Sequence, residues 1–158
     1  MKISKRSRYA LRLCLDLAVN QKDGCVSLSE ISQRQGVSKK FLEHVVQDLN
    51  KEGILQTYRG FAGGYRLARD VQEISLADIL RATETTSCLV SCMNQGEYCA
   101  MYDVCVSRSV WDGLMQVVDE YCRKMTLEVI LKQAPNGNGL LEEKPVFGLI
   151  DGCSKDND

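Results

Sequence analysis

The segment from residue 27 to residue 68 constrains the fold more than any other part of the chain. Residues 27–30 read SLSE and predict a capping box, in which a serine and a glutamate three residues later bond each other's backbone amides at a helix start. Gly36 then suits a tight turn, and Ser38 is a favoured N-cap for a second helix. Two short helices joined by a glycine-containing turn are typical of a helix-turn-helix.

The second of these helices has one apolar face and one polar face. Its apolar positions recur at the three- and four-residue spacing of a helix and predict a face turned to the core. They are Phe41, Leu42, Val45, Val46 and Leu49. Helical hairpins with other functions share this pattern, so a merely solvated outer face stays open as an alternative.

A glycine-rich hairpin follows the two helices. Residues 54–59 and 65–68 predict short strands, and the GFAGG run at 60–64 predicts the loop that joins them. A helix-turn-helix followed by a hairpin is a winged helix. The loop lacks the Lys-Ser/Thr ending of a nucleotide-binding P-loop, but its glycines, near Arg59 and Arg66, would let the backbone approach phosphates closely.

The outer face of the second helix and the hairpin loop supply the predicted DNA contacts. In the major groove a lysine can donate to guanine or to a phosphate, and Glu43 can accept from cytosine N4. Because His44 is the only histidine and no catalytic grouping is visible, we do not expect an enzyme. The predicted DNA-binding residues are Ser38, Lys39, Lys40, Phe41, Glu43, His44, Arg59, Gly60, Gly63, Gly64 and Tyr65.

Helical patterns also flank the winged helix. A helix over about residues 4–18 precedes it, and a short helix capped by Ser75 follows it. The helix from about Arg108 to Lys124 carries two apolar stripes, one for the local core and one left over for a second copy, so we expect a homodimer. The predicted class is therefore mainly α with a small β-wing: a winged helix-turn-helix domain plus a long C-terminal dimerisation helix.

These patterns divide the chain into four parts. The predicted parts are a winged helix-turn-helix domain at 1–83, a cysteine-rich loop at 84–106 that is predicted to bind a metal cluster, a dimerisation helix and following short helix at 107–133, and a disordered tail at 134–158.

Charge is unevenly distributed along the 158 residues. Residues 1–70 hold 13 Lys or Arg against 7 Asp or Glu, whereas residues 71–158 hold 7 against 14. A basic first half favours a polyanionic partner such as double-stranded DNA. The N-terminal apolar stretch is interrupted by charge and no run of 18 apolar residues occurs, so we expect a cytoplasmic protein with no membrane partner.

The cysteines predict a metal or redox site. Four of the eight, Cys88, Cys92, Cys99 and Cys105, fall within 18 residues. In a cytoplasmic protein such a density suggests metal or redox chemistry rather than a disulfide framework. The C-x3-C-x6-C-x5-C spacing lacks the closely paired ligands usual in structural zinc sites, and thiolates on one long loop can hold an iron-sulfur cluster. Zinc, and thiol or disulfide chemistry, stay open as alternatives.

The order of these segments resembles the IscR, NsrR, RirA and CymR family of bacterial winged-helix regulators. The resemblance covers residues 1 to about 133, and the wing sequence RGFAGGYRLARD is its most specific part. It implies a homodimer held by the long C-terminal helix, with the second helix of the helix-turn-helix and the wing of each protomer on DNA.

In its cluster-binding members, three loop cysteines ligate a [2Fe-2S] or [4Fe-4S] cluster. By position these ligands are Cys92, Cys99 and Cys105. Arg108 stands where an IscR-like sequence has a ligand histidine, and a guanidinium cannot ligate iron because it stays protonated. Cys88 is the nearest spare thiolate and a candidate fourth ligand.

The sequence therefore predicts a dimeric DNA-binding transcriptional regulator controlled by an iron-sulfur cluster, which senses iron, cluster status, nitric oxide or redox stress. The alternative is a thiol-switched or zinc-binding regulator of the same fold.

Overall fold

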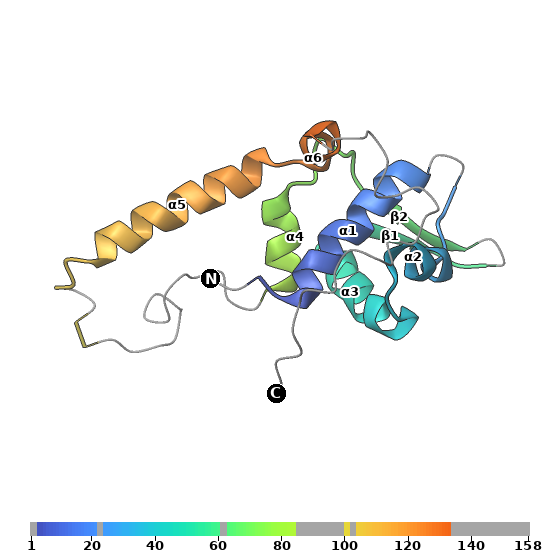
Figure 1. The fold of residues 1–158 in the computed structure, drawn as a ribbon, viewed down its shortest axis with the longest axis horizontal. Helices are drawn as coiled ribbons and strands as arrows, with labels where there is room; N and C mark the ends of the chain where they lie inside the picture. The colour runs from blue at the N-terminus through green and yellow to red at the C-terminus, as the bar shows by residue number, and fades with distance from the viewer. Residues whose placement is uncertain (1–2, 22–23, 61–62, 85–99, 102–103, 134–158) are drawn as a thin grey trace.

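The computed structural model describes residues 3–21, 24–60, 63–84, 100–101 and 104–133 (Figure 1). Over these residues the chain forms helices and one small antiparallel sheet, which confirms the predicted fold class. The elements are α1 (Lys5–Asn20), α2 (Leu28–Gln35), α3 (Lys39–Lys51), β1 (Leu55–Tyr58), β2 (Gly64–Leu67), α4 (Leu76–Thr83), α5 (Arg108–Lys124) and α6 (Leu127–Gln133). Most of the predicted part at 84–106, and all of the predicted tail at 134–158, lie outside the described residues.

Side-chain caps start the helices of the helix-turn-helix. Ser27 accepts a hydrogen bond from the Glu30 amide at 3.2 Å, and the Glu30 carboxylate accepts one from the Ser27 amide at 2.8 Å, which is the predicted capping box. Gly36 adopts the left-handed conformation with φ 64° and closes α2. Ser38 then caps α3 by accepting from the Phe41 amide. These local bonds set the turn between the two helices.

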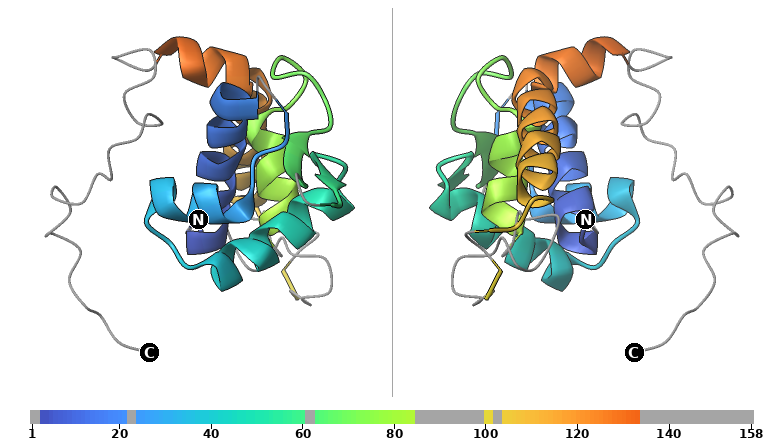
Figure 2. Two further views of the ribbon diagram at one scale, coloured as in Figure 1. Left: turned by 90° about the vertical axis from the view of Figure 1, so that its right-hand side faces the viewer. Right: turned by 90° about the vertical axis from the view of Figure 1, so that its left-hand side faces the viewer.

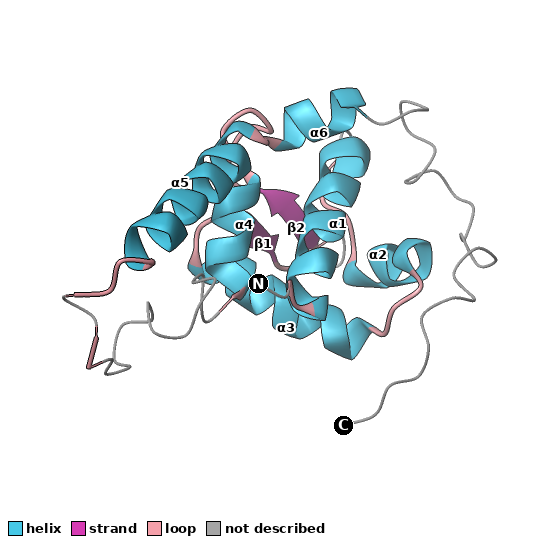
Figure 3. Ribbon diagram, turned by 60° about the vertical axis from the view of Figure 1, so that its left-hand side comes forward, coloured by secondary structure: helices cyan, strands magenta, loops and turns pink. Residues whose placement is uncertain are grey.

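The core is built around α1, which packs against α2, α3, α4 and α6 (Figures 2 and 3). Its side chains meet those of α3 and α4 in one continuous apolar cluster. Fully buried members include Leu13, Leu17, Leu42, Leu49, Ile79 and Leu127. The predicted apolar face of α3 lies in this core, so the opposite face of α3 is turned outward.

A buried carboxylate fixes α2 against α1. Asp16 is completely buried, and its Oδ1 lies 2.6 Å from the Arg34 guanidinium. The Gln35 side-chain amide donates to Asp16 Oδ2 at 2.9 Å. Because a buried charge is stable only when it is paired and hydrogen-bonded, these bonds specify where the last turn of α2 sits on α1.

The wing is a hairpin tied to the start of the helix-turn-helix. Strands β1 and β2 pair in the register Leu55 with Leu67 through Tyr58 with Gly64. Val26, just before α2, bridges Tyr65 through two backbone hydrogen bonds of 2.9 and 3.1 Å. The wing thus has a fixed position relative to α2.

Helix α5 extends away from the rest of the fold, whereas its last turn is anchored at α4 and α6 (Figure 1). The Leu76 amide donates to the Met125 carbonyl at 2.8 Å, and Ser75 pairs with Thr126 in an isolated bridge. Thr126 also accepts from the Val129 amide in the first turn of α6. In the part of the chain that the structure describes, no helix is both long and apolar enough to cross a membrane.

Candidate DNA-binding surface and cysteine site

The outer face of α3 presents charged and polar side chains. Lys39, Lys40, Glu43 and His44 are all exposed, while Leu42 on the opposite side is in the core. The hydroxyl of Ser38, just before them, already caps the helix. The helix therefore offers two ammonium groups, a carboxylate and an imidazole on one surface near its N-terminus.

Phe41 has a different environment from these neighbours. Its ring is half-buried and packs edge-on against Tyr9 of α1, with ring centroids 5.4 Å apart and planes at 82°. An aromatic pair of this geometry adds about 0.5–1.5 kcal/mol beyond its buried area. This contact holds the first turn of α3 against α1.

The glycines of the wing loop are required by the backbone. Gly60 has φ 124°, which side-chain-bearing residues rarely adopt, and a Cβ at Gly63 would lie 2.5 Å from the Tyr58 carbonyl oxygen. The Gly63 amide donates to the Gly60 carbonyl at 3.0 Å. Arg59 and Gly60 are exposed, so they lie where a partner can reach them.

Gly64 and Tyr65 lie deeper in the wing. Gly64 is buried, and a Cβ there would meet the Val26 carbonyl oxygen at 2.5 Å. Tyr65 is half-buried, packs against the core and carries the backbone bridge to Val26. The structure gives both residues a part in holding the wing, and their contact with DNA stays a prediction.

Cys105 is the one residue of the predicted cluster ligands that falls within the described residues. It lies just before Ser107, the N-cap residue of α5, and its Sγ is 3.2 Å from the Ser107 Oγ. This hydrogen bond, with the backbone amides of Arg108 and Ser107, holds the pKa of the Cys105 thiol below its usual value. The thiolate is the form of cysteine that ligates metals, so a cysteine at this position, just before α5, is suited to act as a metal ligand. Cys88, Cys92 and Cys99 lie outside the described residues.

The other described cysteines have environments unlike that of Cys105. Cys14 is fully buried in α1, and burial raises the pKa of its thiol to about 12. Cys122 is buried in α5, where burial and then the charge of Asp119 raise the pKa of its thiol. Cys25 is half-buried beside the wing. Over the described ranges, which hold Cys105 alone of the loop cysteines, no three potential metal-ligating side chains come together.

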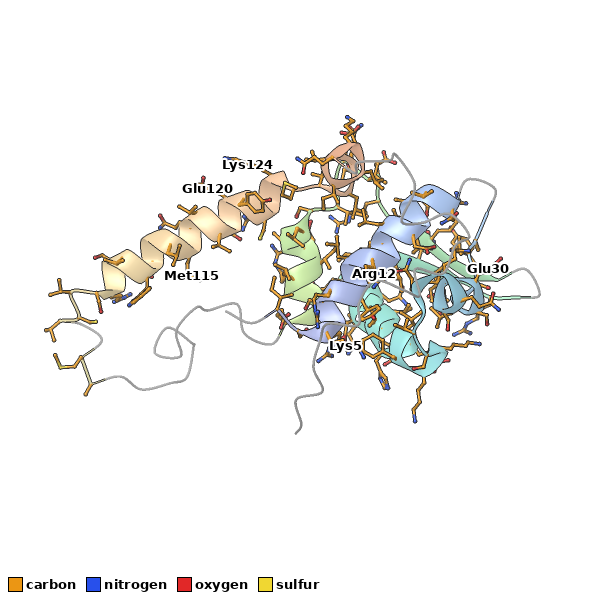
Figure 4. All side chains as sticks on the ribbon, in the orientation of Figure 1. Lys5, Arg12, Glu30, Met115, Glu120 and Lys124 are labelled. Carbon is orange, nitrogen blue, oxygen red and sulfur yellow. The ribbon has the colours of Figure 1, made fainter. Side chains whose placement is uncertain are left out.

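A row of large apolar side chains is exposed along α5. Val110, Leu114, Val117 and Tyr121 are 63%, 45%, 64% and 60% exposed. Their spacing of three and four residues places them on one face of the helix. In Figure 4 the labelled residues Met115, Glu120 and Lys124 mark the course of this helix away from the core. We call the four exposed apolar residues the α5 apolar face.

Comparison with known proteins identifies the family. A family model described as Rrf2, iron-dependent transcriptional regulator, matches residues 3–133. The chain belongs to the Rrf2 family. It is 33% identical over 134 residues to the protein rrf2 of Nitratidesulfovibrio vulgaris, a match that covers 85% of this chain and 89% of that protein.

Solved structures of Rrf2-family regulators have the same fold. The structure of T. potens IscR superposes with a TM-score of 0.68 at 33% identity and covers 85% of this chain and 88% of that one. The structure of CymR, the global cysteine regulator of B. subtilis, gives 0.67 at 30% identity over 82% and 95% of the two chains. The resemblance predicted from the sequence is confirmed, and the chain is a winged-helix transcriptional regulator.

The contact between α1 and the first turn of α3 in this Rrf2-family protein was not predicted from its sequence. The apolar pattern of α1 indicated a core helix, whereas the structure brings Tyr9 of α1 onto the first turn of α3. The signal available was the spacing of Tyr9 from the charged residues Lys5 and Arg12, which places all three on one side of a helix.

Proposed function

We propose that this Rrf2-family regulator is a homodimer that binds a double-stranded DNA operator and whose DNA affinity is set by an iron-sulfur cluster held by Cys92, Cys99 and Cys105. The observation that carries the proposal is the position of Cys105 at the start of α5, the helix with the exposed apolar face. Through this position, a ligand held by the loop acts directly on the proposed dimer helix. The family description, an iron-dependent transcriptional regulator, supports iron as that ligand.

The exposed side chains of α3 and the wing suit duplex DNA. Lys39 and Lys40 can neutralise phosphates or donate to guanine, and Glu43 can accept from cytosine. Arg59 and Gly60, at the exposed end of the wing, are placed to reach the backbone or the minor groove. In this proposal α3 reads base edges and the wing fixes its register.

The α5 apolar face supports the homodimer. A monomer that leaves Val110, Leu114, Val117 and Tyr121 in water would expose a contiguous apolar surface, which in soluble proteins usually marks an interface. A helix face that pairs with the same face of a second copy gives a closed two-fold dimer. Such a dimer presents two copies of α3 to successive major grooves.

When bound, an iron-sulfur cluster supplies iron atoms that join thiolates from different points of a loop. Cys105 would contribute a thiolate that is hydrogen-bonded to Ser107 and to the first amides of α5. Immobilising this thiolate would therefore also immobilise the first turn of α5. Two dimer arrangements that differ in this turn would present the two α3 helices at different spacings. A difference of about 1.4 kcal/mol between them changes operator occupancy tenfold.

Anaerobic purification tests the cluster directly. The full chain is expected to be coloured, with visible absorption and with iron and acid-labile sulfide present in similar amounts. Colourless protein that contains zinc would support the zinc-binding alternative. Colourless, metal-free protein whose DNA affinity changes with thiol oxidation would support the thiol-switched alternative. Either result would overturn the cluster.

Substitutions on α3 and the wing test DNA recognition. Arg59→Ala should weaken binding to all sequences alike, because it leaves one phosphate without its cation. The slope of the logarithm of the binding constant against the logarithm of the salt concentration should fall in magnitude by about 1 per protomer.

Glu43→Ala should relax the base preference at one operator position by about 1–3 kcal/mol, because it removes a base contact. Glu52→Ala, an exposed acid at the far end of α3, is the matched control. An unchanged ranking of operator variants in Glu43→Ala would exclude Glu43 from base readout.

A further inference from the structure

A network of polar side chains joins the start of α1 to the end of α4. It consists of Ser4, Ser7, Thr83 and Glu84, and we call it the Glu84 network. Ser7 and Thr83 are 1% and 4% exposed, and Glu84 is half-buried. The helices α1 and α4 pack against each other (Figure 1). Because a buried hydroxyl that loses its partner carries the full cost of desolvation, the network specifies one arrangement of these two helices.

The Glu84 carboxylate is the acceptor at the centre of the network. Its Oε1 accepts from the Ser4 backbone amide at 2.8 Å and from the Ser7 hydroxyl. The Ser7 hydroxyl oxygen lies 2.7 Å from the Thr83 hydroxyl, and Ser4 caps α1 by accepting from the Ser7 amide at 3.1 Å. A carboxylate beside the N-terminus of a helix is also favoured by the helix dipole. A displacement of Glu84 would therefore carry the start of α1 with it, or leave an amide and a buried hydroxyl without their shared acceptor.

The start of α1 is also bound to α3. Arg6, in the first turn of α1, pairs with Asp48 of α3 at 2.9 Å. Tyr9, in the next turn, packs edge-on against Phe41 in the first turn of α3. The same turn of α3 carries the exposed Lys40, which is proposed to contact DNA. The Glu84 network is therefore joined, through the first two turns of α1, to the end of α3 that is proposed to read the operator.

Glu84 stands at the boundary between the winged helix and the cysteines. Cys88 follows it by four residues and Cys92 by eight. Cys105, the last of the proposed ligands, lies just before α5. The residues on the two sides of the cysteine segment are thus bound to different parts of the fold, Glu84 to α1 and Cys105 to the start of α5.

We propose that Glu84 is a positioning residue for DNA binding, which transmits the state of the cysteine site to the first turn of α3 through the start of α1. The inference rests on the proposed iron-controlled DNA binding and adds a route within one chain to the route through the dimer helix α5. Metal binding that draws the cysteines together restricts the backbone that follows Glu84, and so favours one position of its carboxylate. Coupling between two sites requires an element that both sites bias, and the start of α1 is that element.

The test measures the operator affinity of the full chain with iron bound and after iron removal by a chelator, and compares the two values. The probe is a DNA duplex that the wild type selects from a random-sequence pool. Glu84→Ala removes the acceptor of both bonds. In Glu84→Gln the amide oxygen can take its place, because a single carboxylate oxygen accepts both of them. Glu128→Ala is the matched control, since Glu128 is a half-buried carboxylate of α6 that accepts from Gln72 rather than from α1.

The operator affinities of the iron-bound and iron-free wild type should differ about tenfold or more. Glu84→Ala should reduce this difference to less than about twofold, while its visible spectrum and its iron and sulfide content stay those of the wild type. Glu84→Gln should keep the difference within about threefold of the wild-type value, and Glu128→Ala should leave it unchanged. A merely structural role of Glu84 would weaken both forms alike and would not alter the difference.

Hydrogen exchange of the wild type gives a second test that does not depend on any variant folding. Amides in the first turns of α1 and α3 should exchange at different rates in the iron-bound and iron-free protein, because the start of α1 follows Glu84. Equal exchange in these turns would overturn the inference. So would a Glu84→Ala protein that keeps the wild-type difference in affinity, or one that loses its iron, since Glu84 would then act on the metal site itself.

Failure of the proposed function would give a distinct result. It would appear as a wild type that binds no iron, or whose operator affinity is unchanged by iron removal, and the inference would fall with it.

Discussion

The double variant Val110→Asp/Val117→Asp is expected to sediment as a monomer at micromolar concentrations, whereas the wild type is expected to sediment as the proposed dimer. Both valines are more than 60% exposed on the α5 apolar face, so neither contributes to the core of its own chain. In a two-fold dimer each substitution would bury a carboxylate twice, and each unpaired buried ion costs several kcal/mol. A total of about 4 kcal/mol already weakens dimerisation about a thousandfold.

The same variant should lose most of its operator affinity, because one protomer can engage only half of a two-fold operator. Ser109→Asp/Gln116→Asp is the matched control. It adds two carboxylates at the same seven-residue spacing on a different, polar side of α5. A Val110→Asp/Val117→Asp protein that stays dimeric, with unchanged circular dichroism, would show that the dimer is held elsewhere.

The elements of the winged helix could be predicted from sequence because their causes are local. The hydroxyls of Ser27 and Ser38 satisfy amides three residues ahead of them, so the sequence alone specifies where α2 and α3 begin. Ser75 and Asp78 form a second capping box at α4 in the same way. The apolar stripe of α3 likewise depends only on helical spacing.

What the sequence did not indicate depends on residues far apart in the chain. Asp16 interrupts the apolar pattern of α1. Its complete burial is explained only by the hydrogen bonds from Arg34 and Gln35, which lie 18 and 19 residues later in the chain. The backbone bridge between Val26 and Tyr65 joins segments that are far apart in the sequence. No local pattern therefore predicts that the Val26 backbone packs against the start of β2. The contact between Tyr9 and Phe41 was hidden for the same reason, since α1 meets the first turn of α3 only in the folded chain.

Replacing Cys105 by serine is expected to remove the visible absorption of anaerobically purified protein and to lower its iron and sulfide content about tenfold or more. A serine hydroxyl is not deprotonated at neutral pH, so the start of α5 would lose a sulfur whose thiolate form is favoured by the Ser107 hydroxyl and the backbone amides of Arg108 and Ser107. Cys92→Ser and Cys99→Ser should have the same effect, because the proposed cluster needs all three thiolates. In each variant the operator affinity should no longer respond to iron removal.

Cys25→Ser and Cys122→Ser are the matched controls, since they remove thiols that lie beside the wing and inside the fold. Both should keep a wild-type spectrum. Cys88→Ser then decides the fourth ligand, because Arg108 is paired with Asp112 at 3.6 Å and a guanidinium does not ligate iron. If Cys88→Ser keeps the spectrum, then the fourth ligand is another group, from this chain, its partner or a small molecule. Unchanged iron content in all four loop variants would exclude a cysteine-bound cluster and leave DNA binding to be controlled by thiol chemistry or zinc.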